Sequence, residues 1–382
     1  MHKRYFSCRI ILIAAFFSVF VSTNLASAPD PESKTVASDV GTLSGNFNVT
    51  PAGQAHYTIP IDVSPGTAGM VPALSIAYDS SSSNTKNGLL GMGFSLEGLT
   101  LITRCPSNKT ENGVIHGVDY TDQDRFCLNG EQLVAIKGVY GADGTEYRTY
   151  NDSKAKIISY GRQGNGPASF KVWTKGGQIA EYAVTPDSQI KAQGKESVAV
   201  WNLNKIQDTV GNYLEVIYFK DEAKGSFYPT EIKYTGNEKA KLKPYNSVKF
   251  IYEDRPDLKT SYQAGSIGTL DKRLKTIQTY QSLTLVHEYR LNYELSKNTF
   301  RSRIANIQKC TGAGVCLPPT KFEWQTNEEG WVEAPEFKLP EVLFNDKTAY
   351  AIEGKTLMMP MSRCYSTWLK DYLDIAYIEG RK

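Results

Sequence analysis

GNFNVTPAGQAHYTIPIDV (residues 45–63) and GLLGMGFSLEGL (residues 88–99) are the stretches of this chain that decide its fold. In the first, apolar side chains recur at every second position from Tyr57 to Val63, and this period of two predicts a half-buried strand. In the second, glycines interrupt an apolar run that is too short for a helix. Glycine inside a strand pattern marks a bulge or the close approach of another backbone segment. The two stretches predict a strand–loop–strand unit with a tight glycine corner and no obvious catalytic group.

The rest of the chain has the turn pattern of antiparallel hairpins. Asn129-Gly130 separates two apolar runs, and it closes a tight turn because both residue types accept positive φ. Asp143-Gly144 is predicted to do the same, and no segment sustains a helical stripe over a dozen residues. Further strands are predicted at Val248–Tyr252, Leu274–Tyr280, His287–Tyr293 and Ile304–Gln308. The expected fold class is therefore all-β, with antiparallel hairpins and meanders that form extended twisted sheets and few helices.

The opening stretches also carry a family resemblance. GNFNVTPAGQAHYTIPIDVSPGTAGMVPALSIAYDSSSSN, followed by GLLGMGFSLEGLTLITRCP, resembles the opening of the SpvB N-terminal family. This family comprises the Salmonella virulence plasmid B protein and the B components of insecticidal Tc toxin complexes. The resemblance covers roughly residues 41–344, and its motif residues in the second stretch are Gly88, Gly91, Gly93 and Phe94.

A second resemblance begins near residue 200. WNLNKIQD (residues 201–208) and GNYLEVIY (residues 211–218) together resemble one tyrosine-aspartate unit of RHS repeats. In such a unit Asp208 caps a turn, Gly211-Asn212 reverses the chain, and the returning strand contains Tyr218. The resemblance implies kinship with a shell-forming architecture, without a regular array.

The two ends of the chain differ from its middle. Residues 1–28 read as a signal peptide, with a basic start, an apolar run and a small-residue cleavage site, although an uncleaved membrane anchor is the alternative. Export would place the protein outside the cell, in the periplasm or at the cell surface. Residues 29–44 are a flexible leader, and 45–344 form the SpvB-like β domain. Residues 345–382 depart from the family, either because this is a natural short member or because the tail of an interrupted gene is out of register.

Cysteine spacing predicts two local disulfides. Of the six cysteines, Cys8 leaves with the signal peptide and Cys364 is left over. In an exported protein the remaining four pair most simply as Cys105–Cys127 and Cys310–Cys316. Zinc is the alternative, but the five residues between the last pair do not match the spacing of a zinc knuckle.

The residues that carry chemistry show no recognisable pattern. The balance of 43 Lys and Arg against 40 Asp and Glu gives a net charge of +3, which is too small and too evenly spread for a nucleic-acid partner. His56, His116 and His287 read as residues of strand faces and of a loop. Three acidic residues lie close together and could hold calcium weakly, but a solvated loop is the better interpretation of Asp119, Asp122 and Asp124. We predict no catalytic residue, cofactor or metal.

The resemblance implies a non-enzymatic role. The chain would be the N-terminal part of a secreted toxin-complex or virulence B-type protein, contributing a β-shell that encloses a toxin payload. Its partners would be an A-type pore component and a C-type payload protein. The Glu-x-Glu pair of the ADP-ribosyltransferase domain known in the virulence protein does not occur in this chain, so that activity is not expected.

Three other interpretations stay open, and an enzyme is the least favoured of them. One of the other two is a non-functional fragment of a longer toxin gene. The other is a secreted carbohydrate- or surface-binding β-protein, whose platforms would come from Trp173, Trp201, Trp324 and Trp331.

Overall fold

The computed structural model describes residues 41–82 and 87–324, together with three short strands near the C-terminus. The chain divides into a first unit, residues 1–325, and a second unit, residues 326–382. In the second unit the strands β23 (Ala351–Ile352), β24 (Thr356–Leu357) and β25 (Ile378–Glu379) form a small antiparallel sheet. The predicted signal peptide, the leader up to residue 40, Cys364 and Trp331 lie outside the described residues.

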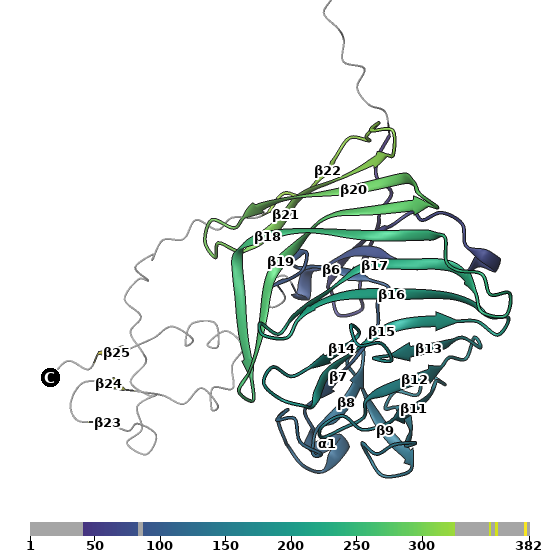
Figure 1. Ribbon diagram of the computed structural model, residues 1–382. Coiled ribbons are helices and arrows are strands. Elements are labelled where there is room, and N and C mark those ends of the chain that lie inside the picture. Colours follow the sequence, from purple (N-terminus) through teal and green to yellow (C-terminus); the bar gives the residue numbers. More distant parts are fainter. Residues whose placement is uncertain (1–40, 83–86, 325–350, 353–355, 358–377, 380–382) are drawn as a thin grey trace, which may run out of the picture. The chain divides into compact units, whose positions relative to one another are not determined.

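The described part of the first unit is nearly all strand, which confirms the predicted fold class (Figure 1). Its helical content is one four-residue helix and two short 3-10 turns: α1 (Lys109–Asn112), η1 (Thr67–Gly69) and η2 (Ser80–Ser82). None of the helices in this part of the chain has the length and apolarity needed to cross a membrane.

The N-terminal stretch forms a small antiparallel sheet in the order β1-β2-β3-β6. These strands are β1 (Asn46–Val49), β2 (Ala55–Pro60), β3 (Ser75–Asp79) and β6 (Phe94–Glu97). The predicted strand ends earlier than expected, at Pro60, but Ile59 and Ile61 are buried as its alternation requires. The glycine corner is a two-stranded hairpin made of β4 (Asn87–Gly88) and β5 (Gly91–Met92).

The next strands close into an eight-stranded antiparallel barrel. It closes because β15 pairs with β7 through Trp201 and Ile102, and with β13 through Ile206 and Ala180. The strands are β7 (Leu101–Cys105), β8 (Arg125–Leu128), β9 (Glu131–Lys137), β10 (Glu146–Thr149), β11 (Lys156–Tyr160), β12 (Ser169–Trp173), β13 (Ile179–Tyr182) and β15 (Val198–Gln207), and β14 (Gln189–Lys191) pairs alongside β15. The sequence predicts sheets but not this closure, because closure depends on pairing between strands about 100 residues apart.

A long antiparallel sheet continues from β15 (Figure 1). Its strands follow one another in sequence order: β16 (Asn212–Asp221), β17 (Ser226–Asn237), β18 (Asn246–Gln263), β19 (Ser266–Gln281), β20 (Thr284–Leu295), β21 (Ser302–Thr311) and β22 (Thr320–Lys321). The four strands predicted between residues 248 and 308 all lie within β18, β19, β20 and β21. Tyr289 and Leu291 are buried on β20, whereas Arg290 and Asn292 are exposed, as the period of two requires.

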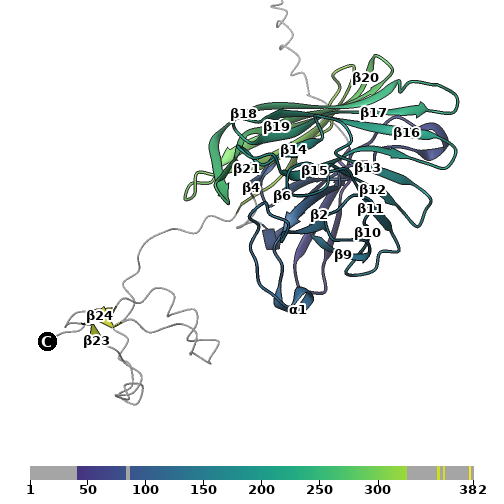
Figure 2. The same ribbon diagram turned by 60° about the horizontal axis from the view of Figure 1, so that its bottom comes forward.

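The small sheet lies on one face of the long sheet (Figures 1 and 2). Tyrosine hydroxyls connect the two sheets: the backbone N–H of Asp62 donates to Tyr289 Oη at 2.8 Å, and Tyr234 Oη donates to the Ser64 carbonyl at 2.8 Å. Each of these hydroxyls is thereby paired although its side chain is fully buried. The two sheets and the barrel therefore share one continuous hydrophobic core.

The chain turns at each of three positions where the sequence predicts a turn. Asn129 and Gly130 have φ of +49° and +89° and form the two-residue connection between β8 and β9. Asp208 accepts from the backbone N–H groups of Val210 and Asn212, and so caps the turn. Within this turn Gly211, with φ of +94°, reverses the direction of the chain. Asp143-Gly144 also closes a tight turn, because the N–H of Thr145 donates to the Ala142 carbonyl at 3.4 Å and Gly144 has φ of +72°, although this turn lies within the longer loop between β9 and β10.

Both predicted cysteine pairs are joined. The sulfurs of Cys105 and Cys127 are 2.03 Å apart and connect the neighbouring strands β7 and β8. Those of Cys310 and Cys316 are 2.04 Å apart at the end of β21. Each bond therefore crosslinks segments that are already adjacent in the sheet, which is why their spacing along the sequence was sufficient to identify them.

Candidate functional site

The three histidines of the described chain do not form a common site. His56 on β2 lies 3.0 Å from Thr58 Oγ1, and His116 lies 3.4 Å from Asp119. On β20, burial lowers the pKa of His287 below its ordinary value, and the nearby Lys309 lowers it further. No hydrogen-bond or ion-pair partner is shared among them within the described residues.

One cluster has the composition of a cation site. Ligand atoms of His116, Asp119 and Asp124 lie within 4.8 Å of one another. Asp124, however, is 1% exposed and forms an ion pair with Arg104 at 2.9 Å. Because the guanidinium already neutralises Asp124, a metal ion there would meet a buried positive charge. The sequence-based interpretation of a solvated loop is wrong for Asp124, whereas Asp122 is exposed and lies 3.5 Å from Arg162.

Arg104 is the centre of a polar network at the barrel. Its side chain is 1% exposed, and its guanidinium carbon lies 5.7 Å from the centre of the Trp201 ring. Besides Asp124 it donates to three backbone carbonyls: those of Thr121 (3.1 Å), Asn165 (2.6 Å) and Val198 (2.7 Å). These partners come from three separate segments, so one side chain ties together loops that the sequence keeps far apart.

The glycine corner is a close backbone approach, as predicted. Gly91 has φ of +79°, and a Cβ atom there would lie 2.4 Å from the carbonyl oxygen of Ser302 on β21. The neighbouring carbonyl of Leu89 accepts from the backbone N–H of Leu274 at 2.8 Å. The motif of Gly88, Gly91, Gly93 and Phe94 therefore joins the N-terminal stretch to strands far along the sequence.

Replacing Gly91 with alanine is expected to destabilise the fold by more than about 1 kcal/mol, because the residue combines positive φ with contact to backbone. The matched control is Gly130→Ala, since Gly130 also has positive φ (+89°) but a Cβ atom added there would have no neighbour within 4 Å. Urea unfolding of both variants gives the comparison. Equal losses in the two would show that the approach to Ser302 is unimportant.

A clamp of Asn87, Arg255, Asp257 and Ser302 holds the same corner; we call it the Arg255 clamp. Arg255 donates to Asn87 Oδ1 (2.8 Å), to the Gly88 carbonyl (3.1 Å) and to Asp257 Oδ2 (2.9 Å). Asp257 also accepts from the backbone N–H of Ser302 at 2.7 Å. The side chains of Arg255 and Asp257 are 0% and 8% exposed, so this ion pair is shielded from solvent.

The Arg255 clamp is expected to weaken in acid. Burial by itself would raise the pKa of Asp257, but hydrogen bonds from Arg255, Ser302 and Asn87 outweigh it and hold the pKa well below 3.8. The ionised group therefore stabilises the fold above the unfolded-state pKa, and this stabilisation is lost as the pH falls below about 4. Urea midpoints of wild type and Asp257→Asn should converge over that range. A difference between the two urea midpoints that stays the same at every pH would contradict the expected loss of the clamp in acid.

An aromatic row crosses the whole small sheet. Phe47, Tyr57, Tyr78 and Phe94 are direct register partners on β1, β2, β3 and β6, so their side chains lie on one face. Phe94 is 3% exposed, Tyr57 and Tyr78 are half-buried, and Phe47 is 66% exposed. The row thus runs from the hydrophobic core to the solvent at the edge strand β1.

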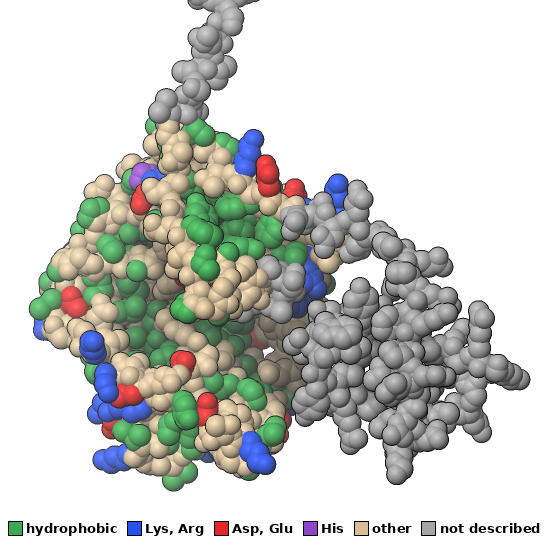
Figure 3. All heavy atoms as spheres, turned by 180° about the vertical axis from the view of Figure 1, so that it is seen from behind, with side chains coloured by type: hydrophobic (Ala, Val, Ile, Leu, Met, Phe, Trp, Pro, Cys, Tyr) green, Lys and Arg blue, Asp and Glu red, His purple; other side chains and the backbone are tan. Residues whose placement is uncertain are grey.

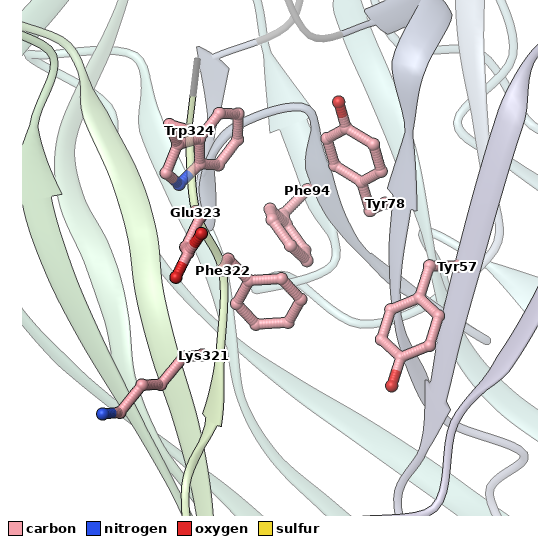
Figure 4. Close-up of a pocket in the computed structure, with 7 residues that line it drawn as sticks. All are labelled: Tyr57, Tyr78, Phe94, Lys321, Phe322, Glu323 and Trp324. Atoms are coloured by element: carbon pink, nitrogen blue, oxygen red, sulfur yellow. The ribbon is translucent and has the colours of Figure 1, made fainter. Parts of the chain in front are cut away.

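Residues after β22 pack over this row and leave a groove, which is our candidate binding site (Figure 4). Phe322 lies 5.0 Å from Phe94, and Trp324 lies 6.0 Å from Tyr78, measured between ring centres. The cavity between them has a volume of about 290 Å³. Viewed from the face opposite to Figure 1, hydrophobic side chains gather around a hollow in the described surface (Figure 3).

The four tryptophans proposed as platforms have different surroundings. Trp201 is 0% exposed inside the barrel core and cannot meet a ligand there. Trp173 is half-buried on β12. Trp324 lines the groove and donates its indole N–H to the Ile304 carbonyl at 2.8 Å. Trp331 lies outside the described residues.

Sequence reasoning missed the aromatic row and the Arg255 clamp. Tyr57 and Phe94 stood out only as a strand residue and a motif residue. Asn87, Arg255 and Ser302 carried no signal at all, because each lies among other polar residues and the sequence does not show which of them are buried. The alternation of apolar residues on both sides of the glycine corner was the one signal that could have located the row.

Comparisons with known proteins agree with this architecture. A family model described as Salmonella virulence plasmid 65kDa B protein (SpvB) matches residues 49–253. The crystal structure of TcdB2-TccC3 is 17% identical, with a TM-score of 0.60, over 75% of this chain and 17% of that chain. A structure of the Photorhabdus luminescens Tc holotoxin pore is 16% identical, with a TM-score of 0.59, over 75% of this chain and 16% of that chain.

A shorter structure matches almost in full. The N-terminal domain of effector protein SpvB from Salmonella typhimurium strain LT2 is 18% identical, with a TM-score of 0.54, over 66% of this chain and 98% of that chain. No curated protein matches the chain. At these identities the solved structures establish a common fold, and this chain spans only 17% of the length of the TcdB2-TccC3 chain.

Proposed function

Since this chain belongs to the Salmonella virulence plasmid 65kDa B protein (SpvB) family, we propose that it is a non-enzymatic B-type component of a secreted toxin complex. In this role its sheets form part of a wall around a toxin payload. A wall requires a continuous sheet with a buried apolar face, and the long sheet joined to the closed barrel is suited to that. The partners are a C-type payload protein and an A-type pore component.

The aromatic row is the observation that carries the proposal. Its outer strand β1 is an edge strand with the sequence NFNV, in which Phe47 is 66% and Val49 is 60% exposed. This edge has no charge, proline or bulge of the kind that keeps edge strands from pairing. An extended segment of the C-type partner can add to β1 and extend the aromatic row with its own apolar side chains.

Binding to a C-type payload protein tests this proposal. The full chain is mixed with the purified partner, and complex formation is followed by size-exclusion chromatography and titration. Because Phe47 is exposed, Phe47→Ser should leave the fold intact and weaken binding at least about tenfold, the loss expected for an aromatic anchor. Tyr262→Ser, at another exposed aromatic (74%), serves as the matched control. A wild-type chain that forms no complex would overturn the partner assignment.

Export is part of the same proposal. Two disulfides are the usual mark of an oxidising compartment, and both cysteine pairs here lie at bonding distance. Intact-mass analysis of protein from the extracellular and periplasmic fractions should show a chain that begins just after Ala28 with both bonds formed. Full-length chains retained in the cytoplasm with free thiols would contradict export.

Carbohydrate binding is the second candidate, favoured by the stacked aromatic side chains around Trp324. A glycan array separates the two functions. Specific glycan binding by the wild type that is lost in Phe322→Ser would favour carbohydrate binding as the function. An array without specific binding would favour the toxin-complex role.

A further inference from the structure

A second cavity lies between the small sheet, the start of the barrel and the long sheet. It has a volume of about 460 Å³, within the range of small-molecule sites. Most of its lining is apolar and comes from widely separated segments, including Leu96, Leu99, Phe227, Tyr228 and Pro229. Phe94 lines both this cavity and the aromatic groove.

One unpaired donor lines this cavity. Asn202 on β15 is 3% exposed, yet its amide nitrogen Nδ2 has no hydrogen-bond partner among the described residues. The backbone of the same residue is satisfied, because its N–H donates to Ser188 and its carbonyl accepts from Ala183. Leaving a buried amide donor unpaired is costly, so the position calls for an acceptor that the fold itself does not supply.

Several other polar groups around the cavity are already paired within the protein. Thr100 Oγ1 lies 2.8 Å from Tyr182 Oη, and Tyr218 Oη donates to the Leu203 carbonyl at 2.9 Å. Asn204, two residues along the same strand, accepts from the backbone N–H of Val184 at 3.0 Å. Among the residues that line the cavity, Asn202 is the one with a buried side-chain donor that has no acceptor among the described residues.

A single charged residue completes the lining. Lys259 on β18 is exposed and is the one charged side chain around the cavity. No ion-pair partner for it occurs among the described residues. A cationic group at the side of an apolar cavity favours an anionic ligand over a neutral one.

We propose that this cavity binds a fatty-acid anion. The apolar chain fills the space between Leu96, Leu99 and Phe227, an oxygen of the carboxylate accepts from Asn202 Nδ2, and the charge of Lys259 attracts the anion. This inference is independent of the toxin-complex role, so either one can fail without the other.

Isothermal titration of the full chain with dodecanoate tests the site. The wild type should bind one equivalent saturably. Asn202→Leu should bind at least about tenfold more weakly while keeping or gaining stability, because it removes an unpaired polar group. A purely structural asparagine would instead lose stability on this change. Asn204→Leu is the matched control: Asn204 does not line the cavity and its Oδ1 accepts from the Val184 N–H, so this variant should bind as the wild type does but lose stability.

Two more variants sharpen the result. Leu99→Trp should fill the cavity and abolish binding, and Lys259→Met should weaken it about tenfold. No saturable binding by the wild type, or equal binding by Asn202→Leu, would overturn the site. Unchanged affinity in Lys259→Met would overturn the assignment of an anion.

Discussion

Replacing Arg104 with leucine is expected to lower the free energy of unfolding by about 3–5 kcal/mol, the cost of leaving one partner of a buried ion pair uncompensated. Asp124, at 1% exposure, would remain charged in the barrel without its guanidinium. Three backbone carbonyls would lose their donor at the same time. Urea unfolding followed by tryptophan fluorescence measures the loss, since Trp201 packs beside Arg104.

Arg162→Leu is the control for this change. Arg162 contacts Asp122 at 3.5 Å, and the two side chains are 62% and 64% exposed, so the effect should stay within about 0.5 kcal/mol. If Arg104→Leu costs no more than the control, the barrel does not depend on this network.

Replacing Asp257 with alanine is expected to cost about 3 kcal/mol, because Arg255 would keep a buried charge without its carboxylate. The loss should be accompanied by release of the glycine corner, since Asp257 also accepts from Ser302 and Asn87. Hydrogen exchange at the Leu274 amide, which donates to Leu89, reports that release.

Asp254→Ala tests whether burial is what matters here. Asp254 lies on the same strand and pairs with Lys272, but its side chain is 88% exposed. Its removal should change stability by less than about 0.5 kcal/mol and leave exchange at Leu274 unaltered. A comparable loss in both variants would mean that the Arg255 clamp contributes no more than a surface pair.

These networks explain why a chain with so many polar strand residues still has one defined arrangement. Aromatic and branched side chains supply the burial, but they would tolerate several strand registers. A buried guanidinium with fixed carbonyl partners is compatible with only one strand register, because any shift of register leaves the guanidinium unpaired. Arg104 and Arg255 therefore fix the positions of the barrel loops and of the glycine corner, and the aromatic groove lies beside that corner.

The sequence by itself determined the features that depend on near neighbours along the chain. The period of two in β20, the Asn129-Gly130 turn, the Asp208 cap and both cysteine pairs are local, so residue type and spacing were sufficient to predict them. The family resemblance was also readable, because the glycine corner keeps a distinctive string of residues.

The tertiary structure alone decided the barrel closure, the aromatic row, the burial of Asp124 and the unpaired amide of Asn202. Each depends on segments that residue types alone do not bring together: β15 meets β7 about 100 residues away, residues 322–324 pack over the aromatic row, and Arg104 reaches carbonyls as far along the chain as Val198. Local spacing gives the direction in which a side chain points from its own strand. What that side chain touches depends on long-range pairing, which residue types do not encode individually.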